Sequence, residues 1–416
     1  PLVYTRSVAD PSWGVKLTGK EGDHTIATFL ARDGLTNFLL PGSRGSSTAS
    51  VDRQNDAFVG RYAHDVGDAS SVGVLVTGRQ GGAYENRVAG VDGVFRLSGT
   101  DEIRMQYLTS RTRYPESLFD ELGDDAEDVP RGSFSDEAYR VAYSHDSREW
   151  EWWGGWEDRG PGFRADLGFV RRVDIKDAWA GVRRNFWSEE DAWYNRIRVQ
   201  LDAHTRDDHA GDLVDDHVTF NVRMDGAYQS TLSLWVNRSR DQLERTMFEQ
   251  DSYRAFFNIR PTGDFTCSLN VRLGDAIDFA NLRPADQFRI SPGITWNIGR
   301  HLYIQLDHTR ETLDVDGGRL FSADISQGRF VYQFNVRTFL RAIVQRTAID
   351  RNPVLYDEDV DARDDKLFSE YLFSYKVNPR TVLFLGYSNL VRATDAVDPT
   401  TEGRTLFVKL GYAWVL

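Results

Sequence analysis

Histidines next to carboxylates are the residues of this chain best suited to move protons. His204, His209 and His217 bracket the acidic segment Asp207–Asp216, and His308 follows another aspartate. A His–Asp pair can act as a general base or hold a metal ion. No G-x-S-x-G, H-E-x-x-H or P-loop motif accompanies these histidines, so the sequence offers no nucleophile or phosphate loop to go with them.

Carboxylates crowd three connections, at residues 120–128, 207–216 and 357–365. Calcium favours several carboxylate oxygens, so such connections could hold the ion or bridge it to lipid phosphates. The segment Asp314-Val315-Asp316-Gly317 has part of a calcium-loop spacing, without the distal glutamate. The candidate ligands are Asp314, Asp316, Asp124 and Asp125. The alternative is a solvated acidic surface.

Four tryptophans lie close together, at Trp150, Trp152, Trp153 and Trp156. Flat aromatic side chains can bind sugar rings by stacking, which makes a carbohydrate contact one interpretation. The other is an aromatic belt at a membrane interface, where an indole has one apolar end and one wet end. On a strand, Trp150 and Trp152 share a face and Trp153 points to the opposite one.

Composition excludes several classes of protein. The 416 residues include 50 Lys+Arg and 63 Asp+Glu, for a net charge of −13, which argues against a nucleic-acid-binding surface. One cysteine excludes disulfide scaffolds and cysteine-ligated zinc. An aromatic content of 12% is too high for a disordered chain. No stretch approaches the ~18 apolar residues of a transmembrane helix.

A two-residue alternation of apolar and polar side chains recurs along the chain. It is clearest in residues 196–204, 217–224 and 265–273, where Val218, Phe220 and their counterparts alternate with charged or amide residues. Successive side chains of a strand point to opposite faces, so this pattern predicts strands of about ten residues with two different environments.

The predicted connections alternate between short Gly, Asn or Asp turns and longer polar segments. The longer segments are predicted at Gly34–Asn55, Pro115–Asp136, Gly160–Val173, Asp207–Asp216, Arg240–Asp251, Glu311–Gly318, Arg351–Asp364 and Thr394–Glu402. Short turns on one side and long loops on the other are typical of outer-membrane barrels. A soluble propeller or sandwich is the alternative, although no repeat of 40–50 residues supports a propeller.

We therefore predict an all-β fold, a large antiparallel transmembrane β-barrel of the bacterial outer membrane. The strand number is even, about 18–22, and counting Leu2–Ser7 as the first strand gives 22. Residues 1–416 are expected to form a single barrel domain. The C-terminal segment resembles the signal that such barrels present to their assembly machinery, with Lys409, Gly411, Trp414 and Leu416 at the characteristic positions.

Four segments carry a resemblance to a known family. They are Tyr4-Thr5-Arg6, Gly14–Lys20, Asn86–Asp92 and Asp166–Asp174, which combine unusual charged and glycine positions. The chain resembles the uncharacterised bacterial proteins that join a carbohydrate-binding-family-9-like N-terminal domain to a large C-terminal outer-membrane barrel. The resemblance implies that the chain is the barrel portion, with the N-terminal domain apparently absent, and it implies no activity or catalytic residue.

The polar face of the predicted strands carries many charges that would line the interior of a barrel. Charged rings of this kind select ions or solutes in pores. The candidate lining residues are Arg104, Arg196, Arg198, Asp202, Arg223, Arg272, Asp307, Arg341 and Glu370. A barrel of about twenty strands is too wide for side chains alone to fill, so water, an inserted loop or another domain must occupy it.

Three functions are compatible with these patterns. The first is a gated or plugged conduit for a solute or polymer, with a saccharide as one option. The second is a non-conducting surface scaffold that holds a partner, and the third is an outer-membrane hydrolase. Expected partners are outer-membrane lipid and lipopolysaccharide, the barrel assembly machinery, and the chain's own N-terminal domain or another protein in the lumen. No nucleic acid and no firm cofactor beyond loop Ca²⁺ is expected.

Overall fold

Strands make up almost all of the structure. The computed structural model describes Val8 and residues 10–123, 129–189, 192–243, 246–395 and 398–413. Its large sheet has 21 strands, and a separate two-stranded hairpin accompanies it. Two compact units divide the chain: residues 1–184, 200–218 and 240–247 form the first unit, and residues 185–199, 219–239 and 248–416 form the second.

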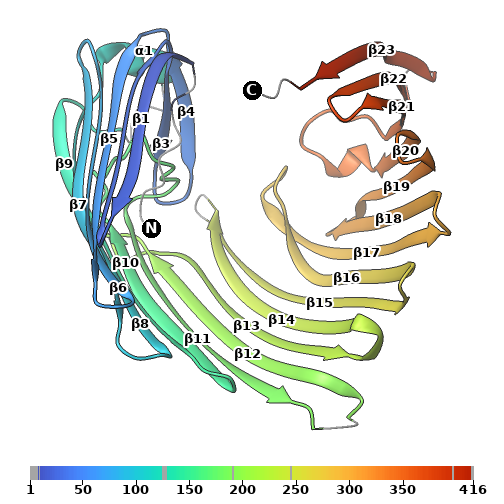
Figure 1. Ribbon diagram of the computed structural model, residues 1–416, viewed down its shortest axis with the longest axis horizontal. Coiled ribbons are helices and arrows are strands. Elements are labelled where there is room, and N and C mark those ends of the chain that lie inside the picture. The colour runs from blue at the N-terminus through green and yellow to red at the C-terminus, as the bar shows by residue number, and fades with distance from the viewer. Residues whose placement is uncertain are drawn as a thin grey trace. The chain divides into compact units, whose positions relative to one another are not determined.

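The first unit contains the N-terminal strands and one short helix (Figure 1). Its elements are β1 (Pro11–Glu21), β2 (His24–Asp33), β3 (Thr36–Pro41), β4 (Ser46–Val51), β5 (Asn55–Val66), β6 (Ser70–Gly81), β7 (Tyr84–Arg96), β8 (Asp101–Arg113), α1 (Glu116–Leu122), β9 (Ser133–Asp146) and β10 (Trp150–Arg159). Consecutive strands pair antiparallel, and β2 pairs with β5 across the β3–β4 hairpin.

Five strands contribute residues to both units. They are β11 (Ile175–Trp187), β12 (Tyr194–Asp207), β13 (Leu213–Gly226), β14 (Ser230–Leu243) and β15 (Thr246–Thr262), with the short turn η2 (Ala227–Gln229) after β13.

The second unit is a regular antiparallel meander. It contains β16 (Phe265–Asp278), β17 (Arg283–Ile298), β18 (Leu302–Val315), β19 (Gly318–Asn335), β20 (Thr338–Arg351), η3 (Pro353–Leu355), β21 (Arg363–Asn378), β22 (Thr381–Thr394) and β23 (Thr400–Tyr412). Neighbouring strands lie side by side in chain order from β15 to β23 (Figure 1).

Each strand of the large sheet exposes large apolar side chains, mostly on one face. Val72, Val74 and Val76 are exposed on β6, as are Val218 and Phe220 on β13. We call this the lipid face and the opposite one the polar face. Leaving so much contiguous apolar surface in water would be costly, whereas lipid solvates it. Among the described residues, no helix is long and apolar enough to cross a membrane.

These features define the fold class. Long antiparallel strands in chain order, an apolar outer surface and polar side chains on the other face are the hallmarks of outer-membrane barrels. The fold is that of a transmembrane β-barrel of the bacterial outer membrane. The 21 strands of the sheet are consistent with a prediction of about 22, and Leu2–Ser7, the predicted first strand, lies outside the described residues.

Several predicted long connections are wrong because the strands continue beyond the length a membrane requires. β14 runs to Leu243 and β15 begins at Thr246, within the segment predicted as a loop. β18 and β19 are joined only by Asp316 and Gly317. Gly317 and Gly318 have positive φ, which makes this tight reversal possible. The predicted Asp207–Asp216 connection shrinks to residues 208–212 for the same reason.

Candidate functional site

Three arginines lie side by side on the polar face of the second unit. Arg254 of β15 stands opposite Arg272 of β16, and Arg272 stands opposite Arg289 of β17. Their sequence neighbours Tyr253, Leu273 and Phe288 are exposed on the lipid face, which fixes the arginines on the polar one. We call Arg254, Arg272 and Arg289 the arginine row.

The arginine row has fewer carboxylates than guanidinium groups. Arg289 lies 3.8 Å from Glu311, and Arg254 donates a hydrogen bond of 3.2 Å to the Asn270 side chain. No residue in the described part of the chain forms an ion pair or hydrogen bond with Arg272. Like charges directly opposite each other in a sheet are destabilising. The arrangement therefore costs stability, and an anion placed over it would remove that cost.

A second group of arginines surrounds Asp225 at the end of β13. Arg196, Arg198 and Arg223 lie 3.2, 3.1 and 3.0 Å from its carboxylate oxygens. Three cations therefore share one anion, in the same unit as the arginine row. Arg196 also lies over the Trp187 ring, 4.9 Å from its centroid.

The other predicted lining residues also lie on the polar face, the arginines paired with glutamates and the aspartates hydrogen-bonded to glutamines. Arg341 contacts Glu370 at 2.6 Å, and Asp307 accepts a hydrogen bond of 2.8 Å from Gln305. In the first unit, Arg104 contacts Glu102 at 2.5 Å. Asp202 accepts a hydrogen bond of 2.6 Å from Gln200. Their role in lining a pore remains a prediction.

Three segments pack onto the polar face of the first unit, which the sequence did not foresee in this form. Loop residues 160–174 place Phe163, Ala165, Val170 and Val173 against buried side chains of β6 to β9. The hairpin β3–β4 and helix α1 pack in a second cluster, in which Phe38 contacts Tyr84 and Tyr114 edge to face. Figure 1 shows this hairpin and α1 beside one end of β1, β5 and β7. We call the three segments the inserted segments.

Buried polar groups hold the inserted segments in place. Asp166 is almost fully buried, and it accepts hydrogen bonds from the Tyr84 and Tyr114 hydroxyls at 2.8 and 3.1 Å. Burial raises the pKa of Asp166 more than these two hydroxyls lower it, and burial also raises the pKa of Tyr114. The fully buried Arg79 donates to the Asn55 side chain and to the Asn37 carbonyl at 2.9 and 2.8 Å.

His209 joins the inserted loop to its surroundings. Its Nδ1 lies 2.9 Å from Asp174, at the end of the loop, and its Nε2 lies 3.0 Å from Asp158 on β10. Each ring nitrogen of His209 therefore faces one carboxylate. We call the Asp158–His209–Asp174 triplet the histidine bridge.

The other candidate histidines make structural contacts. His204 lies 2.6 Å from Asp177, and its ring stacks on His217 at 4.8 Å between centroids. His308 contacts Ser326 at 2.8 Å on the lipid face of the second unit. The partners of these side chains are carboxylates, an arginine, a hydroxyl and each other, and no specific observation favours hydrolysis.

The tryptophan cluster divides between the two faces. Trp150, Trp152 and Trp156 are exposed on the lipid face, as an interfacial belt requires, and Trp153 points to the polar face. There Trp153 lies over Gly181, and Trp179 of β11 lies over Gly155; a Cβ at either glycine would collide with an indole. The two rings line a cavity of about 810 Å³ with Arg61, Asp92 and Arg140.

The remaining candidates are only partly described. Asp314 is held by Arg319 at 2.8 and 3.1 Å, and Asp316 is exposed in the β18–β19 turn. Within the described ranges, no three His, Cys, Asp or Glu side chains are arranged to hold a metal ion. Lys409 and Gly411 lie on β23. Asp124, Asp125, Trp414 and Leu416 lie outside the described residues.

Sequence reasoning missed Arg254, Arg289 and Trp179. Arg254 follows a segment assigned to a loop, although the alternation of Tyr253, Ala255 and Phe257 would have placed it on a strand. The close approach of Arg254, Arg272 and Arg289 depends on strand register, for which a single sequence has no signal.

Solved structures of outer-membrane proteins resemble this chain in fold. No family model and no curated protein matches the chain. The siderophore receptor PirA from Acinetobacter baumannii is 8% identical, with 94% of this chain and 74% of that chain covered and a TM-score of 0.48. A point mutant of the ferric enterobactin receptor PfeA from Pseudomonas aeruginosa is 10% identical, covering 93% and 80%, with a TM-score of 0.40. OmpT of Vibrio cholerae is 13% identical, covering 96% and 100%, with a TM-score of 0.24.

Proposed function

We propose that this protein is an outer-membrane conduit that prefers anionic solutes. The observation that carries the proposal is the arginine row, in which three guanidinium groups stand opposite one another on the polar face with one carboxylate beside them. The arginines around Asp225 add a second cationic group on the same face. Positive charge on a water-facing surface raises the local concentration of anions and lowers that of cations.

Ion selectivity in planar bilayers tests this proposal. Under a KCl gradient, the wild-type protein should give a reversal potential of the sign that chloride permeation produces. Arg272→Glu should shift that potential toward cation selectivity, because it places a carboxylate between Arg254 and Arg289. Arg238→Glu is the matched control, since Arg238 lies on β14 with the exposed Leu234 and Val236 on the lipid face. Cation selectivity in the wild-type protein, or the absence of channels, would contradict the proposal, and absence would favour the scaffold.

A saccharide is the second candidate solute, supported by the paired indoles. Trp153 and Trp179 each lie over a glycine, and the guanidinium groups of Arg183 and Arg140 lie 5.5 and 4.4 Å from the centroids of the two rings. The cavity therefore combines aromatic rings with charged hydrogen-bond donors. Aromatic faces pack on the apolar faces of sugar rings, and nearby polar groups can hydrogen-bond the hydroxyls. Block of the single-channel current by maltooligosaccharides in the wild-type protein, lost in Trp153→Ala but retained in Trp152→Ala, would support this assignment.

The inserted segments supply a means of gating. They are well packed in the first unit, and the part of the chain that the structure describes contains no separate domain to serve as a plug.

We further propose that the chain is the barrel portion of the family it resembles. The fold class agrees with that assignment, and the intact mass of the protein isolated from its source would show whether an N-terminal domain precedes the barrel.

A further inference from the structure

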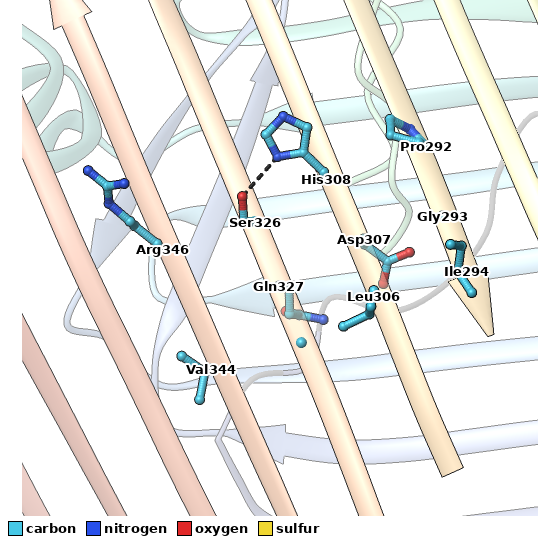
Figure 2. A pocket seen from close by; sticks show the side chains of 11 residues that line it. Pro292, Gly293, Ile294, Leu306, Asp307, His308, Ser326, Gln327, Val344 and Arg346 are labelled. Atoms are coloured by element: carbon cyan, nitrogen blue, oxygen red, sulfur yellow. Dashed lines mark hydrogen bonds between the residues drawn. The ribbon is translucent and has the colours of Figure 1, made fainter. Parts of the chain in front are cut away.

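A groove on the lipid face of the second unit combines an apolar floor with a polar end. It measures about 460 Å³ and lies across β17 to β20. Figure 2 shows Leu306, Val344 and Ile294 at one end of it, and His308, Ser326 and Arg346 at the other. The sheet register explains this division, because the residues belong to two adjacent cross-strand rows.

The lower row is apolar and contains a gap. Ile294 stands opposite Leu306, Leu306 opposite Gly328, and Gly328 opposite Val344. Gly328 has no side chain, and the Phe330 ring and Leu306 border it, since a Cβ at Gly328 would stand 2.9 Å from that ring and 3.5 Å from Leu306. The row is therefore indented at Gly328, with Phe330 and Leu306 as the walls of the indentation. A depression of this kind on a lipid-facing surface fits an acyl chain better than a flat strand surface does.

The upper row and the next one carry hydrogen-bond donors. His308 stands opposite Ser326 and Ser326 opposite Arg346, while Arg310 lies one row further along β18. Half or more of the Arg310 and Arg346 side chains is exposed. These polar side chains lie on the same face as the apolar row. A molecule that covers both must therefore present polar groups to His308 and the arginines, and an apolar part to the row of Leu306, Gly328 and Val344.

Carboxylates nearby leave some of these donors available. Asp365 is shared by Arg346 and Arg363, and Asp324 lies 3.5 Å from both His308 and Arg310. The Asp350 carboxylate also interacts electrostatically with Arg346. Three arginines and His308 therefore stand against three carboxylates, and each paired carboxylate is divided between two cationic side chains. Guanidinium groups match phosphate geometry well and keep several N–H donors beyond one ion pair.

The depth of the groove matches the upper boundary of the hydrocarbon layer. From the exposed Phe334 at one end of β19 to Ser326 is eight residues, about 27 Å along the strand and about 20 Å along the membrane normal for a strand tilted by ~40°. The apolar band of such barrels is about 25 Å tall. The longer connection of residues 352–362 lies beyond the polar end, whereas tight turns at 299–301 and 336–337 lie at the other. The polar row therefore faces the outer leaflet.

We propose that this groove binds the phosphorylated glycolipid of the outer leaflet, the lipid A part of lipopolysaccharide. Arg346, Arg310 and His308 contact a glucosamine phosphate, and one acyl chain lies over Gly328 between Leu306 and Val344. The site differs from the conduit, because its side chains lie on the opposite face of the sheet from the arginine row.

Lipid binding to the full chain in detergent micelles tests the proposal. The probe is fluorescent bisphosphoryl lipid A, competed by unlabelled bisphosphoryl lipid A, by phosphatidylglycerol and by inorganic phosphate. Arg346→Glu is expected to raise the Kd for lipid A at least tenfold. Arg238→Glu, a lipid-face arginine on β14 outside the groove, should change it less than twofold. If Arg346→Glu does not fold, Arg346→Gln and His308→Gln are measured in its place, and each is expected to weaken lipid A binding.

The alternatives have distinct outcomes. Equal lipid A affinity in the wild-type protein and the Arg346 variants would overturn the site. Competition by phosphatidylglycerol as strong as that by lipid A would overturn the choice of occupant. If inorganic phosphate displaces the probe at the same concentration as unlabelled lipid A does, the groove is a site for free anions and not for the glycolipid. Anion selectivity of the channel should be unchanged in Arg346→Gln, which separates this proposal from the proposed conduit.

Discussion

At the scale of single residues, the unusual feature is an excess of arginines over neighbouring carboxylates on a face that meets water. Arg272 stands between two other arginines, and Asp225 serves three arginines at once. Elsewhere on the same face, pairs such as Arg341 with Glu370 are balanced. Structural ion pairs tend toward balance because unpaired like charges reduce stability, so the unbalanced groups are the ones we assign to solute.

The buried carboxylate of Asp166 predicts a pH dependence of the inserted segments. Burial raises its pKa in the folded protein above the value of about 3.9 in an unfolded chain. The folded state then binds the proton more tightly, so this contribution to stability is full below the unfolded pKa and is lost as pH rises through the folded pKa. Asp166→Asn should abolish that loss in pH-dependent unfolding of the solubilised protein. Asp120→Asn, at an exposed position of α1, should leave the pH dependence as it is.

The histidine bridge predicts how firmly loop 160–174 is held. His209→Ala removes two charge-assisted contacts to Asp158 and Asp174, each worth about 1.5–3 kcal/mol when the partner is charged. We expect proteolysis within the loop to accelerate at least tenfold while the sheet stays intact on heat-modifiability gels. His301→Ala, in the β18 turn of the other unit, serves as the control. An unchanged cleavage rate in His209→Ala would show that apolar packing alone holds the loop.

At the scale of elements, alternation predicted the strands well and their ends poorly. Residues 217–224 and 265–273 lie on β13 and β16 with the predicted faces, because a period of two is a local property of the chain. The end of β14 before Leu243 is polar on both faces and resembles a loop in composition. The end of β18 is polar on one face only, because Leu313 and Val315 of the other face belong to a buried apolar cluster. Their strand character comes from hydrogen bonding to neighbours, which only the folded sheet supplies.

The inserted segments escaped the sequence for a similar reason. The sequence predicts Gly34–Asn55 as a long connection, but no local pattern indicates that Phe38 contacts Tyr84 and Tyr114. Likewise, Gly160–Val173 is predicted as a long connection, and its burial against β6 to β9 depends on contacts distant in sequence. Long-range packing of loops is not encoded in a two-residue rhythm.

We expect that a single substitution can release the hairpin β3–β4 from the polar face of the sheet. Phe38→Ala removes a buried ring in contact with two tyrosines, a change that costs about 3–5 kcal/mol in typical cores. We expect the hairpin to leave the polar face more often and the single-channel conductance to rise or to flicker. Leu39→Ala, on the other face of β3, provides a milder control. Identical conductance traces for Phe38→Ala and the wild-type protein would mean that the hairpin does not restrict the pathway.

At the scale of the whole molecule, net charge and local charge have opposite signs. The chain carries −13 overall, yet the groups assigned to solute are arginines. A permeating ion responds to charges within about a Debye length, ~10 Å at 0.1 M salt and ~3 Å at 1 M, rather than to the total.

Selectivity should therefore depend on salt. We expect the preference for chloride over potassium to fall severalfold when the mean KCl concentration rises from 0.1 to 1 M, because screening shortens the reach of the arginine row. Reversal potentials at a constant concentration ratio measure this effect. A preference that is constant across this range would indicate a steric rather than an electrostatic filter.

The account depends above all on which face of the sheet meets water, and adjacent residues of β16 can report it. In a Cys267→Ala background, Arg272→Cys and Leu273→Cys place single thiols on the polar face and on the lipid face of the same strand. In outer-membrane vesicles, a charged water-soluble maleimide should label Arg272→Cys at least tenfold faster than Leu273→Cys. Equal labelling of the two thiols, or faster labelling of Leu273→Cys, would contradict a lipid-embedded barrel with a water-facing arginine row.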